Sequence, residues 1–400
     1  MVRILDSTLR EGEQSPGVVF PAHVRLAVAE ALAAVGVDII EAGHPVVTPE
    51  IRRSVTQLAG AGLPVRIGAH ARALAGDVDE ALACGVDFLG IYLCVAPARL
   101  ADQGLTLVQA VDRIAAAVAR ARAQRPGLLI RFTPEDAVRS PLRHVVIAAA
   151  EAVRAGADIV SIADTTGCLV PGTPRNMHDM VRRVRDGLAA RDAHPLIAVH
   201  CHNDRGLALA NALDGVRAGA DIVDASVLGL GERAGIVDLG QLLAVLAGDF
   251  GGDGRWDLTR LPALYRLVSR AARRPVPAHF PVTGRYAFTH CAGGHVRAAL
   301  VHNGHYASLS PELVGRRAEV ALGHMSGLAA VRHGLDRIGV AADDDLAREV
   351  LAAVKIAGQG GRAVDVEELA LIVRCVAGAD RAPAAPRPEA SPCVMTSVDS

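Results

Sequence analysis

The chain has 400 residues, of which 51% are hydrophobic and 21% charged, and its formal net charge is −1 at pH 7. This balance offers no basic surface for nucleic acid and no charge that would hold the chain on an acidic membrane. No apolar run approaches the roughly 20 residues that span a bilayer, and the first residues form a strand pattern rather than a signal peptide. We therefore expect a soluble, cytoplasmic protein with neither nucleic acid nor a membrane as its partner.

The cysteines and lysines argue against three kinds of chemistry. Seven cysteines are scattered along the chain with no C-x-x-C pair, which argues against a disulfide framework and against a structural zinc site. Lys355 is the only lysine, so nearly all positive charge is arginine. A Schiff-base mechanism therefore has almost no candidate residue.

Short β-branched, apolar runs alternate with helical stretches along the first two thirds of the chain. Strands are predicted at 2–6, 37–42, 64–69, 86–93, 128–133, 158–163, 196–200 and 221–227. The helical period is clear between them, for example in Ala22–Val35, Val108–Ala123 and Asn176–Ala189. Strict alternation implies a parallel sheet. The count of eight favours a closed (β/α)₈ TIM barrel, because an open dinucleotide-binding sheet would carry a Gly-rich fingerprint after its first strand.

The pattern changes after about residue 270, where Ala272–Gly284 is Pro-rich and irregular. Two amphipathic helices are predicted further on, at Asp343–Ala357 and Val364–Val376. The last segment is rich in Pro, Ala and Ser, a composition typical of disorder. We divide the chain into a catalytic barrel (1–270), a linker subdomain that contributes to the active site (271–326), a small helical domain (327–378) and a disordered tail (379–400).

Polar residues gather where the predicted strands end. The active site of such a barrel lies at the carboxyl ends of its strands, whereas a barrel built for stability alone would place ordinary caps and turns there. The chain instead carries, at or just after the strand ends, Asp6, Arg10, Glu11, Gln14, Glu41, His44, His70, Arg131, Thr133, Glu135, Asp164, Thr165, His200, His202, Asn203 and Ser226. These residues predict an active site at that end of the barrel.

A pair of histidines at the seventh strand indicates a metal site. His200 and His202 are two residues apart, so both side chains project to the same side. Glu11, arriving from strand one, would complete a two-His, one-carboxylate face with open positions for a divalent cation. Mg²⁺ or Mn²⁺ is expected there, with Zn²⁺ or Co²⁺ as alternatives. Asp6 could instead orient Arg10 or a metal-bound water. Such a cation would act as a Lewis acid on a substrate with adjacent carboxylate and carbonyl oxygens, and Arg10 would add charge beside the oxyanion.

Three motifs resemble the signatures of one known family. The segments 6–14 (Asp-Ser-Thr-Leu-Arg-Glu-Gly-Glu-Gln), 200–204 (His-Cys-His-Asn-Asp) and 229–235 (Gly-Leu-Gly-Glu-Arg-Ala-Gly) look like those of the 2-isopropylmalate synthase/homocitrate synthase family. The resemblance runs over about residues 2–377. It implies a Claisen-type condensation, in which acetyl-CoA loses a methyl proton, the enolate attacks a metal-bound 2-oxo acid, and the thioester is hydrolysed. It also implies that Glu11 is the metal ligand and that the protein is a homodimer.

The resemblance favours 2-oxoglutarate as the acceptor and homocitrate as the product. Gly235-Ile236 is similar to homocitrate synthases, whereas isopropylmalate synthases usually have Gly-Asn there. The family match places His70 against the distal carboxylate of 2-oxoglutarate, and an anionic tail suits His70 and Arg131 better than a branched alkyl tail does. The residues expected to bind substrate are His70, Arg131, Thr165, Gln14 and His44.

Two departures keep other acceptors open. The segments 41–45 (Glu-Ala-Gly-His-Pro) and 68–73 (Gly-Ala-His-Ala-Arg-Ala) differ from the usual homocitrate synthase pattern. Relatives condense acetyl-CoA with phosphonopyruvate or phosphinopyruvate, whose anionic tails could use the same histidine and arginine, and 2-oxoisovalerate is a further alternative. His44 could tune the site for such a group or be an ordinary loop histidine.

A downstream segment resembles the part of the family that returns to the active site. By the match of residues 288–295 (Phe-Thr-His-Cys-Ala-Gly-Gly-His), His295 takes part in acid–base chemistry together with Glu135, and Tyr306 matches a further family position. Packing alone is the alternative for Tyr306. Together with Arg10, these are the expected catalytic residues.

Two other functions compete with the condensation. A lyase of the same superfamily that cleaves 3-hydroxy-3-methylglutaryl-CoA would need a reactive cysteine in the loop after strand eight, and Gly229–Gly235 contains none. A metal-binding but inactive barrel would have lost Arg10, Glu11 or His202, and all three are present.

Overall fold

The computed structural model of the protein describes residues 2–252 and 254–377. The described chain forms two compact units, of which the first comprises the residues up to Pro277 together with Pro281–Thr283. The second comprises Ala278–Phe280 and the described residues from Gly284 onward. Each unit is described by itself.

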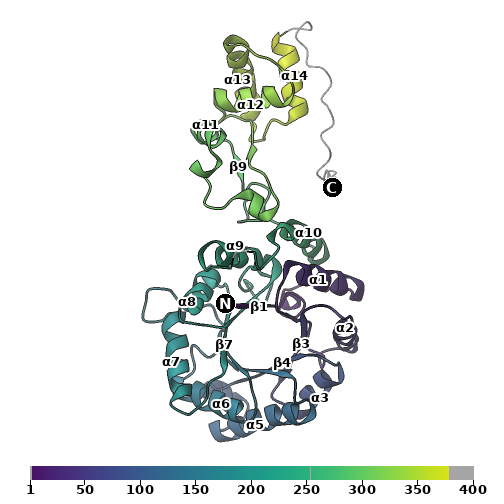
Figure 1. Cartoon of the computed structure of the whole chain (residues 1–400), viewed down its shortest axis with the longest axis vertical. Coiled ribbons are helices and arrows are strands. Elements are labelled where there is room, and N and C mark those ends of the chain that lie inside the picture. Colours follow the sequence, from purple (N-terminus) through teal and green to yellow (C-terminus); the bar gives the residue numbers. More distant parts are fainter. Residues whose placement is uncertain (1, 253, 378–400) are drawn as a thin grey trace. The chain divides into compact units, whose positions relative to one another are not determined.

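The first unit is a closed parallel barrel, which confirms the predicted fold. Eight strands of the described chain pair in sequence order, and β1 pairs with β8 to close the ring (Figure 1). Their bounds are β1 Arg3–Asp6, β2 Ile39–Glu41, β3 Arg66–Arg72, β4 Phe88–Cys94, β5 Leu129–Glu135, β6 Ile159–Asp164, β7 Leu196–Cys201 and β8 Ile222–Ala225. Every predicted strand range overlaps one of these strands, so the alternation of apolar runs identified the whole sheet.

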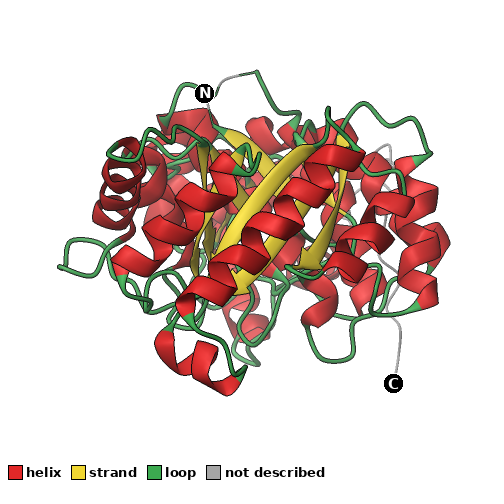
Figure 2. Ribbon diagram, turned by 90° about the horizontal axis from the view of Figure 1, so that it is seen from below, coloured by secondary structure: helices red, strands yellow, loops and turns green. Residues whose placement is uncertain are grey.

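Helices surround the strands (Figure 2). They are α1 Ala22–Val35, α2 Pro49–Ala59, α3 Ala75–Ala83, α4 Pro97–Asp102, α5 Leu107–Gln124, α6 Leu142–Arg154, α7 Met177–Ala189, α8 Ala208–Arg217, α9 Leu239–Asp249 and α10 Leu261–Ala272. Side-chain caps fix several starts: Thr106 and Gln109 form a capping box at α5, and Asn176 accepts a hydrogen bond from Asp179 N–H at α7. Gly36, with φ of 100°, ends α1 in the left-handed conformation that glycine adopts without strain.

An apolar cluster fills part of the barrel interior, and a polar layer adjoins it. The cluster draws one buried side chain from each of six strands: Leu5, Ile39, Phe88, Ile159, Ala198 and Ile222. The guanidinium carbon of Arg131 lies 5.3 Å from the centre of the Phe88 ring, so charged side chains begin directly beside this cluster. The barrel is therefore a packed core at this level, with its polar residues gathered toward the carboxyl ends of the strands.

The second unit contains short strands and helices. Its elements are β9 Thr289–His290, α11 Gly293–Val301, β10 Glu319–Val320, α12 Leu328–Arg337, α13 Asp344–Gly358 and α14 Val366–Ala377. The helices α13 and α14 cover the two amphipathic segments that the sequence predicts. Across the residues that the structure describes, no helix is both long and apolar enough to cross a membrane.

The expected domain boundaries stay predictions, and the two compact units of the structure are bounded by other residues. The first unit extends to Pro277, because α10 continues to Ala272 and packs against α1. Val296 and Leu322 share one hydrophobic core with the buried residues of α12, α13 and α14. This shared core joins the expected linker subdomain (271–326) and helical domain (327–378) from residue 284 onward. The expected disordered tail (379–400) lies outside the described residues.

Candidate active site

A cavity of about 260 Å³ lies at the carboxyl ends of the barrel strands. Its lining includes every barrel residue that the sequence analysis assigned to metal, substrate or catalysis: Arg10, Glu11, Gln14, His44, His70, Arg131, Glu135, Thr165, His200 and His202. Residues without a prior assignment, including Tyr92, Ser161 and Asp224, line it as well. The structure thus brings the barrel part of the predicted site together at one end of the fold.

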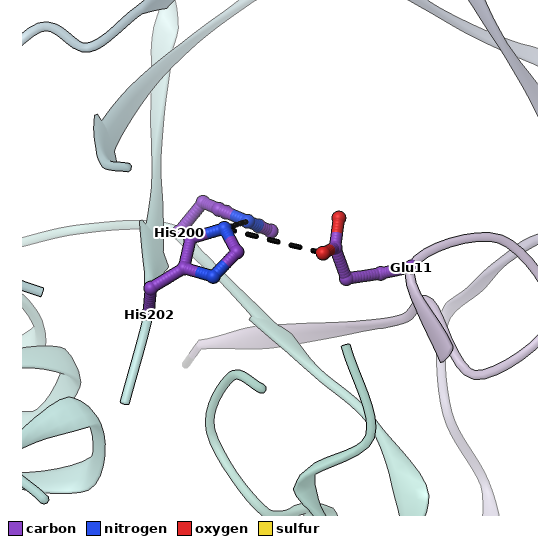
Figure 3. Close-up of side chains that lie close together, drawn as sticks. All are labelled: Glu11, His200 and His202. Atoms are coloured by element: carbon purple, nitrogen blue, oxygen red, sulfur yellow. Dashed lines mark hydrogen bonds and ion pairs between the residues drawn. The ribbon is translucent and has the colours of Figure 1, made fainter. Parts of the chain in front are cut away.

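Glu11, His200 and His202 form a compact group of potential metal ligands (Figure 3). One ligand atom from each lies within 4.8 Å of the others. The two histidine Nε2 atoms are 3.2 Å apart, and His202 Nε2 is 4.0 Å from Glu11 Oε1. All three residues are buried. Figure 3 shows both imidazoles on the β7 side and the carboxylate facing them from the β1 side.

Neighbouring groups hold this carboxylate ionised and in place. Its Oε1 atom accepts a hydrogen bond of 3.1 Å from the backbone N–H of Glu232, in the loop after β8. Its Oε2 atom pairs with Arg10. The Gln14 amide, oriented so that its nitrogen faces Glu11, donates to both carboxylate oxygens. Burial raises the pKa of Glu11, but Arg10 and the two histidines outweigh it and lower the pKa to about 2. Glu11 is therefore an anion at neutral pH.

The donor set fits a divalent cation. Two neutral imidazole Nε2 lone pairs at 3.2 Å repel each other unless a proton or a cation lies between them. Burial, with His200 adding to it, lowers the pKa of His202 to about 4, which disfavours an imidazolium at this position. Two imidazoles and one carboxylate with open positions form the arrangement that binds divalent first-row metals for chemistry on a substrate. The chain can therefore hold a metal ion here.

Glu41, which is fully buried, is the centre of a second cluster. Its Oε2 atom accepts hydrogen bonds from Ser7 Oγ at 2.8 Å and from Arg10 Nε at 2.6 Å. Its Oε1 atom lies 2.9 Å from His70 Nδ1 and 3.1 Å from Arg131 Nη2. Burial raises the pKa of Glu41, but Arg10, His70 and Arg131 hold it well below its ordinary value. One carboxylate thus orients two residues predicted to bind the acceptor and one predicted to be catalytic.

Charged side chains connect this cluster to the metal face in a closed ring. Arg131 Nη1 donates to both oxygens of Asp224, at 2.9 and 2.8 Å, and Asp224 Oδ2 lies 3.0 Å from His200 Nδ1. The charged ring, defined by its members in order of contact, runs through Glu11, Arg10, Glu41, Arg131, Asp224, His200 and His202 and returns to Glu11. Its three carboxylates exceed its two guanidiniums by one, which leaves a surplus negative charge for a bound cation.

Asp6 contacts Thr8 rather than Arg10, and its other considered role, orienting a metal-bound water, stays a prediction. Its carboxylate accepts hydrogen bonds of 2.9 and 3.0 Å from the N–H and hydroxyl of Thr8. Thr8 Oγ1 in turn accepts from the backbone of Val227. Burial raises the pKa of Asp6 to about 7. Asp6 therefore braces the turn that carries Arg10 and Glu11 and does not itself orient the Arg10 guanidinium.

Aromatic rings form one wall of the cavity. Tyr92 stacks on His70, with ring centres 4.7 Å apart and an interplanar angle of 17°. The His44 ring centre lies 6.0 Å from that of His70, and His44 Nε2 is 3.3 Å from Asp77 Oδ2. Burial lowers the pKa of His70 to about 4, although Glu41 acts in the opposite direction. A neutral His70 therefore faces the cavity at neutral pH, beside a second histidine.

Two further predicted residues lie on the β5 and β6 side. Thr165 Oγ1 accepts a hydrogen bond of 2.9 Å from Asp136 N–H, and its own hydroxyl proton is free to point elsewhere. Glu135 lies 3.7 Å from Arg99 Nη2, and burial raises its pKa. A carboxylic acid with a raised pKa is suited to proton transfer near neutral pH.

Buried polar atoms without a partner mark the same side of the cavity. Within the described part of the chain, Arg131 Nε, Thr133 Oγ1 and Ser161 Oγ have no hydrogen-bond partner, and all three residues line the cavity. Leaving a buried polar group unpaired costs roughly 1–3 kcal/mol. Such groups on one wall point to a polar ligand that satisfies them.

The remaining predicted residues belong to the second unit. His295 lies on α11, and its ring stacks on Tyr306 with centres 4.2 Å apart and an interplanar angle of 24°. Tyr306 is about half exposed, at 52%. Their catalytic roles stay predictions.

The two carboxylates that organise the site, Glu41 and Asp224, were not predicted as site residues from the sequence. Glu41 was noted only as a polar strand end, and Asp224 was not singled out. Both are buried charged residues within apolar strands, which is the signal that could have found them. Gly90 was a further signal: a Cβ at this position would lie 2.9 Å from His70 Nδ1 and 3.2 Å from Glu41 Oε1. A glycine inside a strand often marks such a close approach.

Known proteins match both parts of the chain. The HMGL-like family model matches residues 1–268, and a model described as Homocitrate synthase post-HMGL domain-like matches residues 282–361. A homocitrate synthase from Pyrococcus abyssi (strain GE5 / Orsay) is 41% identical over 357 residues, which cover 88% of this chain and 94% of that protein. The chain belongs to the homocitrate synthase family. A more distant family member, from Sulfurisphaera tokodaii, is 38% identical over 359 residues, covering 88% of this chain and 76% of its own.

Solved structures resemble the barrel of this family member. An HMG-CoA lyase from Brucella melitensis has a TM-score of 0.54 and 24% identity, covering 68% of this chain and 99% of its own. A hydroxymethylglutaryl-CoA lyase from Pseudomonas aeruginosa has a TM-score of 0.56 and 23% identity, covering 67% of this chain and 92% of its own. At this identity the likeness concerns the fold alone.

Proposed function

We propose that the chain condenses acetyl-CoA with 2-oxoglutarate, forming a carbon–carbon bond, and hydrolyses the thioester to release homocitrate and CoA. The relatives named homocitrate synthase, at about 40% identity over most of the chain, support this reaction. We also propose that Mg²⁺ or Mn²⁺ is the metal and that the protein is a cytoplasmic homodimer.

The observation that carries the choice of acceptor is the set of unpaired polar atoms in the cavity wall. Arg131 Nε, Thr133 Oγ1 and Ser161 Oγ are buried and lack a partner in the described chain. The distal carboxylate of 2-oxoglutarate can accept hydrogen bonds from all three groups. The isopropyl tail of 2-oxoisovalerate would leave each of them buried and unsatisfied, at roughly 1–3 kcal/mol per group. The wall therefore favours an acceptor with an anionic tail.

The protein's own groups suit the steps of this reaction. A divalent cation at Glu11, His200 and His202 would polarise the oxo group of the acceptor. Arg10, fixed between Glu11 and Glu41, holds a permanent positive charge beside the place where the alkoxide develops. We assign Glu135 to proton transfer with the methyl group of acetyl-CoA, because its raised pKa brings it nearer to the working pH. His295 and Tyr306 remain predicted participants.

A second candidate acceptor has a phosphonate or phosphinate tail. His44 supports it, because this residue adds a second imidazole next to His70 on the cavity wall. Asp77 tethers His44, and Arg72 donates to Asp77 through Nε at 2.7 Å and Nη2 at 3.0 Å. A bulkier anion could contact both imidazoles from within the cavity.

A thiol-release assay tests these proposals. Purified protein with Mg²⁺ or Mn²⁺ and acetyl-CoA receives 2-oxoglutarate, phosphonopyruvate or 2-oxoisovalerate, and free CoA is measured against a reaction without acceptor. We expect the highest kcat/KM with 2-oxoglutarate and the lowest with 2-oxoisovalerate. A preference for phosphonopyruvate would select the second candidate. No free CoA with any acceptor would overturn the transferase proposal.

A further inference from the structure

Asp224 is a buried carboxylate shared between the metal face and the acceptor wall. It lies in β8 and is only 1% exposed. Arg131 Nη1 donates to both of its oxygens, at 2.9 and 2.8 Å. The Oδ2 atom also lies 3.0 Å from His200 Nδ1. Two residues with different tasks, one on β5 and one on β7, thus meet on a single carboxylate.

The contact with His200 sets which nitrogen faces the metal. When Nδ1 carries the proton and donates it to Asp224, the lone pair is on Nε2. That atom is the one that lies 3.2 Å from His202 Nε2, within the group of metal ligands. Asp224 therefore selects the tautomer that binds a cation and fixes the direction of the ring.

The contact with Arg131 sets the direction in which the Nε–H group of this arginine points. Both oxygens of Asp224 accept from Nη1, Glu41 accepts from Nη2, and the Phe88 ring lies against the guanidinium with its centre 5.3 Å from the guanidinium carbon. The Nε–H group is the part of this guanidinium without a partner in the described residues, and Arg131 lines the cavity. A planar guanidinium held at two corners presents its third in a fixed direction.

We propose that Asp224 is a positioning residue. It fixes the His200 ring toward the metal and the Arg131 guanidinium toward the acceptor, so that the two side chains keep one arrangement relative to each other. The acceptor half of this inference rests on the proposed function, whereas the metal half does not. An asparagine at this position has a single carbonyl oxygen, and its amide nitrogen is a donor that faces donors. If this oxygen takes the place of Oδ2, the negative charge is lost and the amide nitrogen takes the place of Oδ1, where it faces Arg131 Nη1 donor to donor.

The first test compares Asp224→Asn with the wild type by calorimetric titration of the metal-free protein with Mn²⁺. We expect the Kd for Mn²⁺ to rise about 10- to 100-fold, as is typical when the partner of a metal-bound histidine is lost. At saturating Mn²⁺ the KM for the acceptor should rise as well. The binding stoichiometry separates a loss of folded protein, which lowers the number of sites, from a change at the site, which alters the Kd.

A matched control removes a similar carboxylate elsewhere. Asp38 also binds an arginine, with both its oxygens 2.8 and 2.9 Å from Arg255 Nη2, and accepts a third hydrogen bond from Ile4 N–H. It lies just before β2, at the amino ends of the strands, and does not belong to the cavity lining of the described residues. The Asp38→Asn variant should leave the Kd for Mn²⁺ and the KM for the acceptor within twofold of the wild type.

A second variant tests the link without touching Asp224. In Arg131→Met, the loss of a nearby cation alone would tighten Mn²⁺ binding. If Arg131 holds the Asp224 carboxylate in position, the Kd for Mn²⁺ should instead rise about threefold or more, as expected for residues coupled in one salt-bridge network. A Kd and KM within twofold of the wild type in Asp224→Asn, a change in only one of them, or tighter Mn²⁺ binding in Arg131→Met would overturn the proposal. If 2-oxoglutarate is not turned over, the Mn²⁺ titrations still decide the metal half, and the KM is measured with whichever acceptor is active.

Discussion

The Glu41→Gln substitution tests how far one buried carboxylate supports the site. Glu41 is fully buried and receives hydrogen bonds from Ser7, Arg10, His70 and Arg131. Hydrogen bonds to a charged group are worth roughly 1.5–3 kcal/mol each. A glutamine oxygen can keep about two of them, so at least two are lost and the guanidiniums lose their buried counter-ion. We expect the free energy of unfolding of the barrel to fall by about 3–5 kcal/mol, the usual cost of breaking a buried ion pair.

This loss can be measured by calorimetry and denaturant unfolding. For a unit of this size it corresponds to a fall in the melting temperature of the barrel of roughly 6–20 °C. Glu80→Gln is the control, because Glu80 pairs with Arg52 at 3.0 Å on the surface, with 38% of its side chain exposed. Such surface pairs contribute roughly 0–1 kcal/mol. A Glu41→Gln variant as stable as the Glu80→Gln variant would refute the reasoning.

The same variant has a defined dependence on pH. Because the pKa of Glu41 is lowered in the folded protein, its contribution to stability is complete above its unfolded pKa of about 4.3. The contribution is lost as the pH falls from there toward the folded pKa. The difference in unfolding free energy between wild type and Glu41→Gln should therefore be constant near neutral pH and shrink below about pH 4.3. A difference that grows on acidification would contradict the sign of this shift.

Three further substitutions probe the metal, the acceptor and the proton transfer. His202→Ala should abolish turnover and raise the Kd for Mn²⁺, because two protein ligands hold an ion less well than three; unchanged metal content and turnover would refute the ligand assignment. His70→Leu should lower kcat/KM for 2-oxoglutarate roughly 30- to 1000-fold without changing the KM for acetyl-CoA. This fall corresponds to a loss of about 2–4 kcal/mol of transition-state stabilisation. A kcat/KM that stays near the wild-type value would remove His70 from the acceptor site. If Glu135 is the base, kcat/KM should rise with pH through a pKa above the ordinary glutamate value, and Glu135→Gln should lose this limb of the profile.

The barrel and the metal face could be predicted because both depend on local patterns. Strand positions follow from short apolar runs, and the active end of a parallel barrel follows from chain direction alone. The spacing of His200 and His202 places both rings on one side of β7. Glu11 needed only to lie after β1, which is next to β8 in the closed sheet.

The partners of the buried charges could not be predicted in this way. Arg131 and Asp224 are 93 residues apart and meet only because of the register and tilt of strands that are not neighbours. Arg131 was predicted to bind the acceptor, but the two carboxylates that hold it, Glu41 and Asp224, could not be predicted. Gly90 pairs with His70 on one side and with Arg131 on the other. Because a glycine and not a larger residue stands at this position, Glu41 has room between them. Such distances depend on three-dimensional closure and not on composition or periodicity.

The second unit was harder to divide than the barrel. The irregular Pro-rich segment was predicted, and α13 and α14 were found from their helical period. The shared core that joins Val296 to these helices could not be predicted, because α11 carries a weak apolar pattern on a short helix. Helices of this length acquire their place through packing rather than through their own propensity.

The charged ring has a consequence for how substitutions in this site combine. Each member contacts the next, and the chain of contacts closes on itself, so every side chain is restrained from two directions. Once one link is broken, its neighbours are already free to relax, and a second break in the same loop costs less than it would alone. Effects of paired variants within the loop should therefore fall short of the sum of the single effects, whereas a variant outside it should add independently. Double-variant cycles around the loop would measure this cooperativity directly.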